Sequence, residues 1–133
     1  MKFFLPSLLL LTLLCTCGPA PEKAATEDEQ TEQATVYQDL SPAEFAGRIG
    51  GKNTVLLDVR TPAETAGGVI EGAIEMDYRA SDFAQKVSEL DPDKTYLVYC
   101  ASGGRSGKTC GKLNEMGFAK VYNLKGGYSA WKQ

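Results

Sequence analysis

Continuous apolar runs alternate with stretches of helical spacing over residues 36–133. Residues 54–59 and 95–100 are almost entirely apolar, which is typical of strands buried on both faces of a parallel sheet. Between them, Phe83, Val87 and Leu90 follow the spacing of one helix face. The alternation predicts an α/β fold, a small doubly wound parallel sheet flanked by helices.

Local signals set the limits of these elements. Ser41 followed by Pro42 and Glu44 is typical of a helix N-terminus, and the glycines at 50–51 and at 117 are typical of helix ends. The expected strands are residues 36–37, 54–59, 72–76, 95–100 and 121–124. The expected helices are residues 42–49, 62–66, 83–90, 105–116 and 128–131.

The start of the chain has a different character. Lys2 precedes an apolar run over residues 3–14, which is shorter than the ~20 residues that a membrane-spanning helix needs. Small residues with Cys15 and Cys17 follow, as at the end of a secretory signal peptide. The segment resembles a bacterial lipoprotein leader, and the position of Leu14 favours Cys17 over Cys15 as the lipidated residue. An ordinary cleaved signal peptide is the alternative.

These features predict three parts. Residues 1–17 are expected to be a lipoprotein-type signal peptide cleaved before Cys17, residues 18–35 an acidic tether, and residues 36–133 the folded domain. The tether has one basic and five acidic residues and no large apolar side chain, so it cannot bury enough surface to fold. The leader's resemblance implies a lipid anchor in the membrane of a bacterial cell envelope, with the domain facing the periplasm or the cell exterior.

Charge and composition exclude several classes of function. The whole chain has 14 basic and 17 acidic residues, but residues 36–133 carry 12 of each. A neutral domain lacks the basic footprint of nucleic-acid binding, so we expect no nucleic-acid partner. The chain has no histidine, which excludes Cys–His and Ser–His catalytic pairs and histidine-containing metal sites. We expect neither a metal nor a cofactor.

The loop after the strand at 95–100 holds the candidate chemistry. Cys100 ends this strand, and ligands of doubly wound sheets bind at such ends. The residues that follow are Ala101, Ser102, Gly103, Gly104, Arg105 and Ser106. Small residues let successive N–H groups point inward, and with the positive end of the next helix they stabilise a thiolate. The pattern predicts a reactive cysteine of lowered pKa. The alternative is a buried structural cysteine.

Four segments together resemble the rhodanese-like domain family. They are Asp58–Glu64, Gly68–Ile74, Cys100–Ser106, and Gly117–Phe118 with Val121–Tyr128 and Trp131. The resemblance spans residues 36–133. Val69 departs from the histidine that is common in the family at that position, which bears on local packing rather than on the reaction.

The resemblance implies an enzyme, a sulfurtransferase. Cys100 would carry a sulfane sulfur as a persulfide, from a small donor such as thiosulfate to a thiol, a cyanide-like acceptor or a protein. The backbone of residues 101–105 would cradle the persulfide, Ser102 could donate a side-chain hydrogen bond, and Arg105 could attract an anionic donor. Asp58, Arg60 and Glu64 would support the loops, with Glu64 as a partner for Arg60.

Other interpretations remain open at this point. The domain could be a persulfide carrier that does not turn over without a protein partner. It could also be a cysteine phosphatase or an arsenate reductase-like enzyme, but those relatives place five residues between cysteine and arginine, whereas four separate Cys100 from Arg105. Cys110 is expected to pack against the sheet as a small apolar residue. Its alternative role is a resolving thiol for Cys100.

Overall fold

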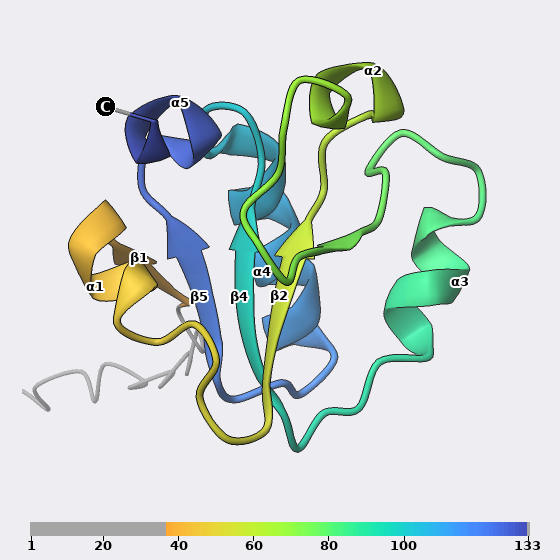
Figure 1. Cartoon of the computed structure of the whole chain (residues 1–133). Coiled ribbons are helices and arrows are strands. Elements are labelled where there is room, and N and C mark those ends of the chain that lie inside the picture. The colour runs from red at the N-terminus through yellow and green to blue at the C-terminus, as the bar shows by residue number, and fades with distance from the viewer. Residues whose placement is uncertain (1–36, 133) are drawn as a thin grey trace, which may run out of the picture. The chain divides into compact units, whose positions relative to one another are not determined.

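A five-stranded parallel sheet forms the centre of the computed structural model, which describes residues 37–132 (Figure 1). The strands are β1 (Gln38–Leu40), β2 (Thr54–Asp58), β3 (Ile74–Glu75), β4 (Thr95–Tyr99) and β5 (Val121–Leu124). Their order in the sheet is β1-β5-β4-β2-β3, and every neighbouring pair is parallel. The predicted doubly wound α/β fold is confirmed.

Five helices connect and cover the strands. They are α1 (Pro42–Ala46), α2 (Pro62–Thr65), α3 (Phe83–Ser88), α4 (Gly104–Glu115) and α5 (Gly127–Trp131). The capping sequence at Ser41 is confirmed, because the Ser41 hydroxyl accepts from the Glu44 amide while the Glu44 carboxylate accepts from the Ser41 amide. Each expected helix is present, within a few residues of its expected limits.

Two expected limits are wrong near the start of the domain. The first strand lies at residues 38–40 rather than 36–37, because its register is set by pairing with β5 and not by its own short apolar pattern. The first helix ends at Ala46 rather than near 49. There the amides of Arg48 and Ile49 bond to carbonyls three residues earlier, and the chain continues in turns.

Side chains on the two faces of the sheet form two apolar cores. Along β4, Tyr96 and Val98 pack toward α3 and α4, while Leu97 and Tyr99 pack toward α1 and α5. The same alternation puts Cys100 on the α4 side. The strand period thus directs the sulfur toward the start of α4, the helix that follows it.

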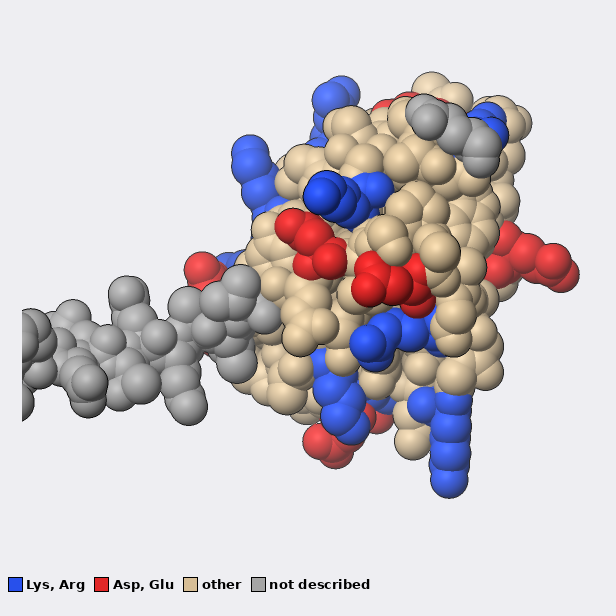
Figure 2. Space-filling view, turned by 90° about the vertical axis from the view of Figure 1, so that its left-hand side faces the viewer, with Lys and Arg blue, Asp and Glu red and all other residues tan. Residues whose placement is uncertain are grey.

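The surface beside α1, β1 and α5 carries acidic and basic side chains in alternation (Figure 2). None of the helices within residues 37–132 has both the length and the apolar character that a bilayer crossing requires. The predicted signal peptide with Cys15 and Cys17, and the predicted tether at 18–35, lie outside the described residues.

Candidate active site

The carboxyl ends of β2 and β4 bring the candidate residues to one edge of the sheet. Asp58 pairs in register with Tyr99, and the Val59 amide donates to the Tyr99 carbonyl at 2.9 Å. The segments that follow, Val59–Arg60 and Cys100–Ala101, therefore leave the sheet next to each other, while α2 and α5 lie at the same end (Figure 1). Parallel pairing explains why segments 40 residues apart in the sequence meet here.

The Cys100 sulfur sits at the bottom of the loop and accepts two hydrogen bonds. The Gly103 amide donates to Sγ at 3.1 Å and the Ser106 hydroxyl at 3.3 Å. Gly103 has φ of 101°, a left-handed conformation that suits glycine, and it is the N-cap residue of α4. This turn folds the chain back so that its amide faces the sulfur. Cys100 is only 1% exposed.

The hydrogen bonds, not the burial, set the ionisation of Cys100. Burial favours the neutral thiol and would raise the pKa. The Ser106 hydroxyl and the backbone amides of Ser106, Ser102 and Gly103 act in the opposite direction, and their sum lowers the pKa of Cys100 below its ordinary value. The arrangement therefore favours a thiolate nucleophile without a histidine.

The start of α5 holds the loop from behind. The Tyr128 amide donates to the Cys100 carbonyl at 2.8 Å, and the Ser129 amide donates to the Ala101 carbonyl at 3.0 Å. Both loop carbonyls are thereby held away from the sulfur, and the loop amides are left free to face it. A Cβ on Gly127 would lie 2.6 Å from Cys100 and Ala101 backbone atoms, so only glycine fits there.

Sequence reasoning did not find this backbone support. It named residues 121–128 and Trp131 as part of the family resemblance and predicted no backbone contact from them to the loop. The signal available was the glycine pair at 126–127, where both residues have positive φ and position the first turn of α5.

Asp58 and Arg60 form a buried ion pair beside the loop. Arg60 Nη2 lies 2.6 Å from Asp58 Oδ2, and the same nitrogen donates to the Gly68 carbonyl at 2.7 Å. The guanidinium also stacks 4.0 Å from the centroid of the Tyr128 ring. Arg60 thus ties the end of β2 to the segment after α2 and to α5. Among the described residues, neither Asp58 nor Arg60 makes a hydrogen bond to the Cys100 sulfur.

Glu64 pairs with Arg105, so the expected side-chain pair of Glu64 with Arg60 is wrong. Arg105 Nη1 and Nη2 donate to the two Glu64 carboxylate oxygens at 2.8 and 2.6 Å, whereas Arg60 reaches only the Glu64 carbonyl, at 3.4 Å. The side chain of Arg60 is instead occupied by Asp58, two residues away. The Arg105 guanidinium holds the pKa of the Glu64 carboxyl well below its usual range.

Ser106, not Ser102, donates the side-chain hydrogen bond to the cysteine. Ser102 is exposed and contributes its backbone amide, while Ser106 lies buried in the first turn of α4. A side chain three or four residues into the following helix points back toward the turn before it, which places the Ser106 hydroxyl over Sγ. Gly104 opens the helix, and its missing Cβ would have met open space.

Cys110 shares the α4 core with Cys100 but differs from it. Both cysteines are free thiols in the described part of the chain. Cys110 is fully buried, and that burial raises the pKa of its thiol far above the ordinary value. Cys110 is therefore placed as a packing residue, and its protonated thiol would be a poor nucleophile. Within residues 37–132, no group of three metal-ligating side chains comes together.

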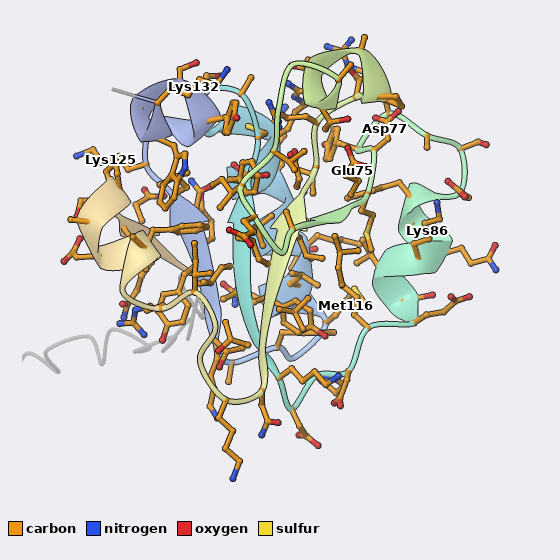
Figure 3. The ribbon with its side chains drawn as sticks, in the orientation of Figure 1. Glu75, Asp77, Lys86, Met116, Lys125 and Lys132 are labelled. Carbon is orange, nitrogen blue, oxygen red and sulfur yellow. The ribbon has the colours of Figure 1, made fainter. Side chains whose placement is uncertain are left out.

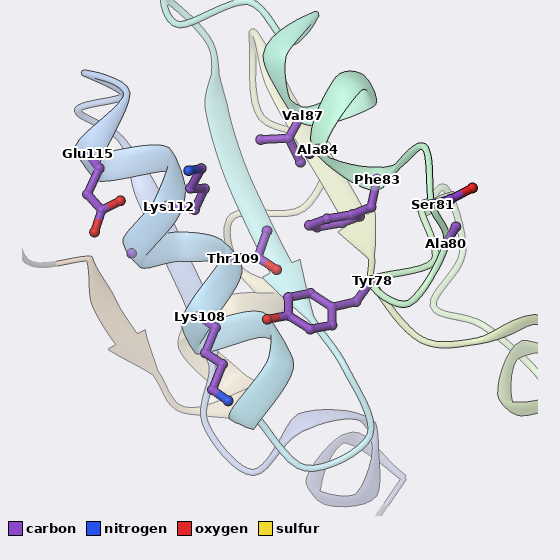
Figure 4. A pocket seen from close by; sticks show the side chains of 11 residues that line it. Tyr78, Ala80, Ser81, Phe83, Ala84, Val87, Lys108, Thr109, Lys112 and Glu115 are labelled. Carbon is purple, nitrogen blue, oxygen red and sulfur yellow. The ribbon is translucent and has the colours of Figure 1, made fainter.

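A hollow in the described surface lies away from the cysteine. It is a groove of about 650 Å³ between α3 and α4 (Figure 4), with Tyr78, Phe83 and Val87 on one side and Lys108 and Lys112 on the other. No residue of the 100–106 loop lines it. The groove and the Cys100 loop are therefore separate features of the described surface.

Comparison with known proteins identifies the family. Residues 41–133 match the model of the rhodanese-like domain. The chain belongs to the rhodanese-like domain family. It is 38% identical over 80 residues to a sulfurtransferase of Allochromatium vinosum, which covers 60% of this chain and 73% of that protein. A tRNA uridine(34) hydroxylase of Nitrobacter hamburgensis is 36% identical over 103 residues, which cover 74% of this chain but only 40% of that longer protein.

Solved structures agree with this membership. The rhodanese-related protein of Thermoplasma volcanium superposes with a TM-score of 0.63 at 32% identity, covering 72% of this chain and 91% of that one. The match includes the parallel sheet and its flanking helices, on which the Cys100 loop is built.

Proposed function

We propose that this member of the rhodanese-like family is a sulfurtransferase that carries a sulfane sulfur as a persulfide on Cys100. The observation that supports it most directly is the Cys100 sulfur, buried and held by the Gly103 amide and the Ser106 hydroxyl. Such donors stabilise negative charge on one sulfur atom, and they would do the same for the outer sulfur of a persulfide.

The proposed reaction has two displacements. The Cys100 thiolate attacks the outer sulfur of thiosulfate, the donor S–S bond breaks, and sulfite leaves with the electron pair. An acceptor thiolate or cyanide then attacks the outer sulfur of the persulfide, and the Cys100 thiolate leaves. Cys100 is a nucleophile in the first step and a leaving group in the second, and a lowered thiol pKa favours the second step.

The loop supports sulfur transfer over oxyanion chemistry. Four residues separate Cys100 from Arg105, and the Arg105 guanidinium is bonded to Glu64 rather than extended over the loop. A tetrahedral phosphate or arsenate would need that guanidinium as a ligand. A single sulfur atom needs only the amides and the hydroxyl that already face it.

The experiment combines turnover with mass spectrometry. The purified protein is given thiosulfate and cyanide, and thiocyanate is measured. In parallel, the mass of the protein is measured after incubation with thiosulfate or an organic persulfide alone. We expect thiocyanate formation and the gain of one sulfur atom on Cys100. The control Cys100→Ser should do neither, and Cys110→Ser should do both.

The outcomes separate the interpretations. No thiocyanate and no added sulfur with any sulfane donor would overturn the proposal. A stable persulfide without thiocyanate would favour a carrier that delivers sulfur to a protein partner. Hydrolysis of an aryl phosphate that is lost in Cys100→Ser would favour the phosphatase interpretation.

We further propose that lipid on Cys17 anchors the protein to a bacterial membrane. The support is the sequence of residues 1–18, with its basic start, short apolar run and Leu14 three residues before Cys17. The measurement is the mass of the N-terminal peptide from membrane fractions. Cys17→Ala should release the protein from the membrane and Cys15→Ala should not, and the reverse result would assign the lipid to Cys15.

A further inference from the structure

The one arginine of the Cys100 loop is neutralised by a carboxylate. Both Arg105 terminal nitrogens bond to Glu64, and their N–O distances of 2.8 and 2.6 Å are those of a two-pronged ion pair. The two side chains are 19% and 33% exposed, so the pair is partly accessible to solvent, and Arg105 lies near enough to Cys100 for their charges to interact. The net charge of the Glu64–Arg105 pair therefore affects the binding of a charged sulfur donor near Cys100.

A second carboxylate, besides that of Glu64, acts on Arg105. This carboxylate is Asp77, and it lines a small hollow next to the site together with Glu75 and Arg60. Figure 3 shows Glu75 and Asp77 near the carboxyl end of β2, below α2. Arg60 is occupied by Asp58, and Lys86, which lines the same hollow, is paired with Asp82. Because Arg60 and Lys86 are each paired with a carboxylate, they provide little net positive charge to attract an anionic donor.

We propose that Glu64, by neutralising Arg105, selects sulfur donors of low charge, namely organic or protein persulfides, over the thiosulfate dianion. The inference rests on the proposed function and names its substrate class. Thiosulfate brings two negative charges toward a thiolate, and an unneutralised arginine beside the loop would reduce that repulsion. An alkyl persulfide brings at most one negative charge, as RSS⁻, and none in its RSSH form.

The reaction with such a donor is balanced. The Cys100 thiolate attacks the outer sulfur of RSSH, a new S–S bond forms on Cys100, and the donor S–S bond breaks. The electron pair leaves with the thiolate RS⁻, and the proton stays on the transferred sulfur. No oxidant or reductant is consumed, because the sulfane sulfur only changes its carrier.

A second capping box in the chain supplies a matched control. Glu64 has two structural roles, since its carboxylate accepts from the Thr61 amide at 2.9 Å while binding Arg105. Glu44 makes the equivalent cap with Ser41 at the start of α1, away from the Cys100 loop. Glu44→Gln therefore measures the effect of losing a capping charge alone, whereas Glu64→Gln also frees Arg105.

The test compares two donors with one acceptor, cyanide. The donors are thiosulfate and the persulfide of an uncharged alkyl thiol. In Glu64→Gln we expect the KM for thiosulfate to fall about tenfold at low salt, with kcat changed less than about twofold. The KM for the alkyl persulfide should stay nearly constant. The gain for thiosulfate should shrink as salt screens the exposed charges. Glu44→Gln should leave the ratio of the two KM values as it is.

The possible results distinguish failure of the donor preference from failure of the proposed sulfurtransferase function. Sulfur transfer with an unchanged donor preference in Glu64→Gln would overturn this inference while leaving the proposed function in place. Absence of transfer from both donors in the unsubstituted protein would overturn the proposed function and the inference together. Should Glu64→Gln fail to fold, Arg105→Gln tests the same pair, and it should raise the KM for thiosulfate without affecting the alkyl persulfide.

Discussion

Two buried cysteines ten residues apart in the same core have thiol pKa values shifted in opposite directions. Cys100 is 1% exposed and Cys110 is 0% exposed, and both belong to the core between the sheet and α4. The pKa of Cys100 is nevertheless lowered, while burial raises that of Cys110. Both side chains are almost inaccessible to solvent, so exposure alone does not account for the difference.

The difference lies in the direction of nearby donors. Cys100 follows the last residue of a strand, where the chain has not yet begun α4 and its amides are free to point at the sulfur. Cys110 lies inside α4, where the amides around it are already bonded within the helix. A helix interior offers a buried thiol apolar contacts, and the turn before the helix offers it hydrogen bonds.

Exchanging each thiol for a hydroxyl is the strongest test of this contrast. Cys100→Ser should lower the rate of sulfur transfer by on the order of 10³-fold or more, because a serine hydroxyl neither ionises near neutral pH nor accepts sulfane sulfur. Cys110→Ser should retain most of the rate. In the unsubstituted protein, iodoacetamide should label Cys100 first, with a rate midpoint below the ordinary thiol pKa. Preferential labelling of Cys110 in the native protein would contradict the comparison.

Gly127→Ala tests whether α5 keeps the loop amides aimed at Cys100. The new Cβ would lie 2.6 Å from the Cys100 carbonyl oxygen, so the loop or α5 must shift. We expect a loss of about 1–3 kcal/mol in the free energy of unfolding and a rise in the pKa of Cys100. Both are measured on one sample, by denaturant unfolding and by alkylation across pH.

Gly72→Ala is the matched control for that experiment. Gly72 also has positive φ, at 84°, but a Cβ there meets nothing within 4 Å. Gly72→Ala should lower the free energy of unfolding because alanine disfavours positive φ, but it should leave the pKa of Cys100 unchanged. A rise in that pKa in both variants would show that general destabilisation, not the support from α5, is responsible.

Ser106→Ala should have a smaller effect. It removes the hydroxyl that donates to the sulfur at 3.3 Å but leaves the Gly103 amide in place. A net hydrogen bond of about 1 kcal/mol predicts a raised pKa of Cys100 and alkylation about fivefold slower below that pKa. Thr109→Val is the control, since the Thr109 hydroxyl donates to the Arg105 carbonyl one turn along α4. Equal slowing in both variants would argue against a specific role for Ser106.

The smallest expected effect concerns stability in acid. The pKa of Glu64 is lowered in the folded protein, so its contribution to stability is present above the ordinary glutamate pKa and is lost as the pH falls through the lowered one. The difference in unfolding free energy between the unsubstituted protein and Glu64→Gln should therefore be constant near neutrality and shrink below about pH 4.5. A difference that grows in acid would contradict the ion pair.

The agreement between sequence and structure is closest where a pattern is local. In three places a few neighbouring residues are enough to predict the conformation. They are the apolar runs that form β2 and β4, the capping residues of α1, and the glycines after Cys100. β1 was misplaced because three residues carry little pattern of their own, and its position depends on pairing with β5.

The partners of the charged side chains could not be predicted in the same way. Glu64 lies four residues from Arg60 and 41 from Arg105, so sequence proximity favoured the wrong pair. Proximity across the sheet edge is decided by which strands are neighbours and by their register, and neither is visible in a local window.

The sequence by itself determined the strand–helix alternation, the place of Cys100 at the end of β4 and the small residues that let the loop curl, because backbone conformation follows from nearby residues. Only the tertiary structure decided which remote segments meet at the loop. The register of β2 against β4 and the packing of α5 place the α5 amides behind the loop and Glu64 against Arg105. Hydrogen bonds and ion pairs act over a few ångströms, and distances of that size between remote segments are set by the assembled fold.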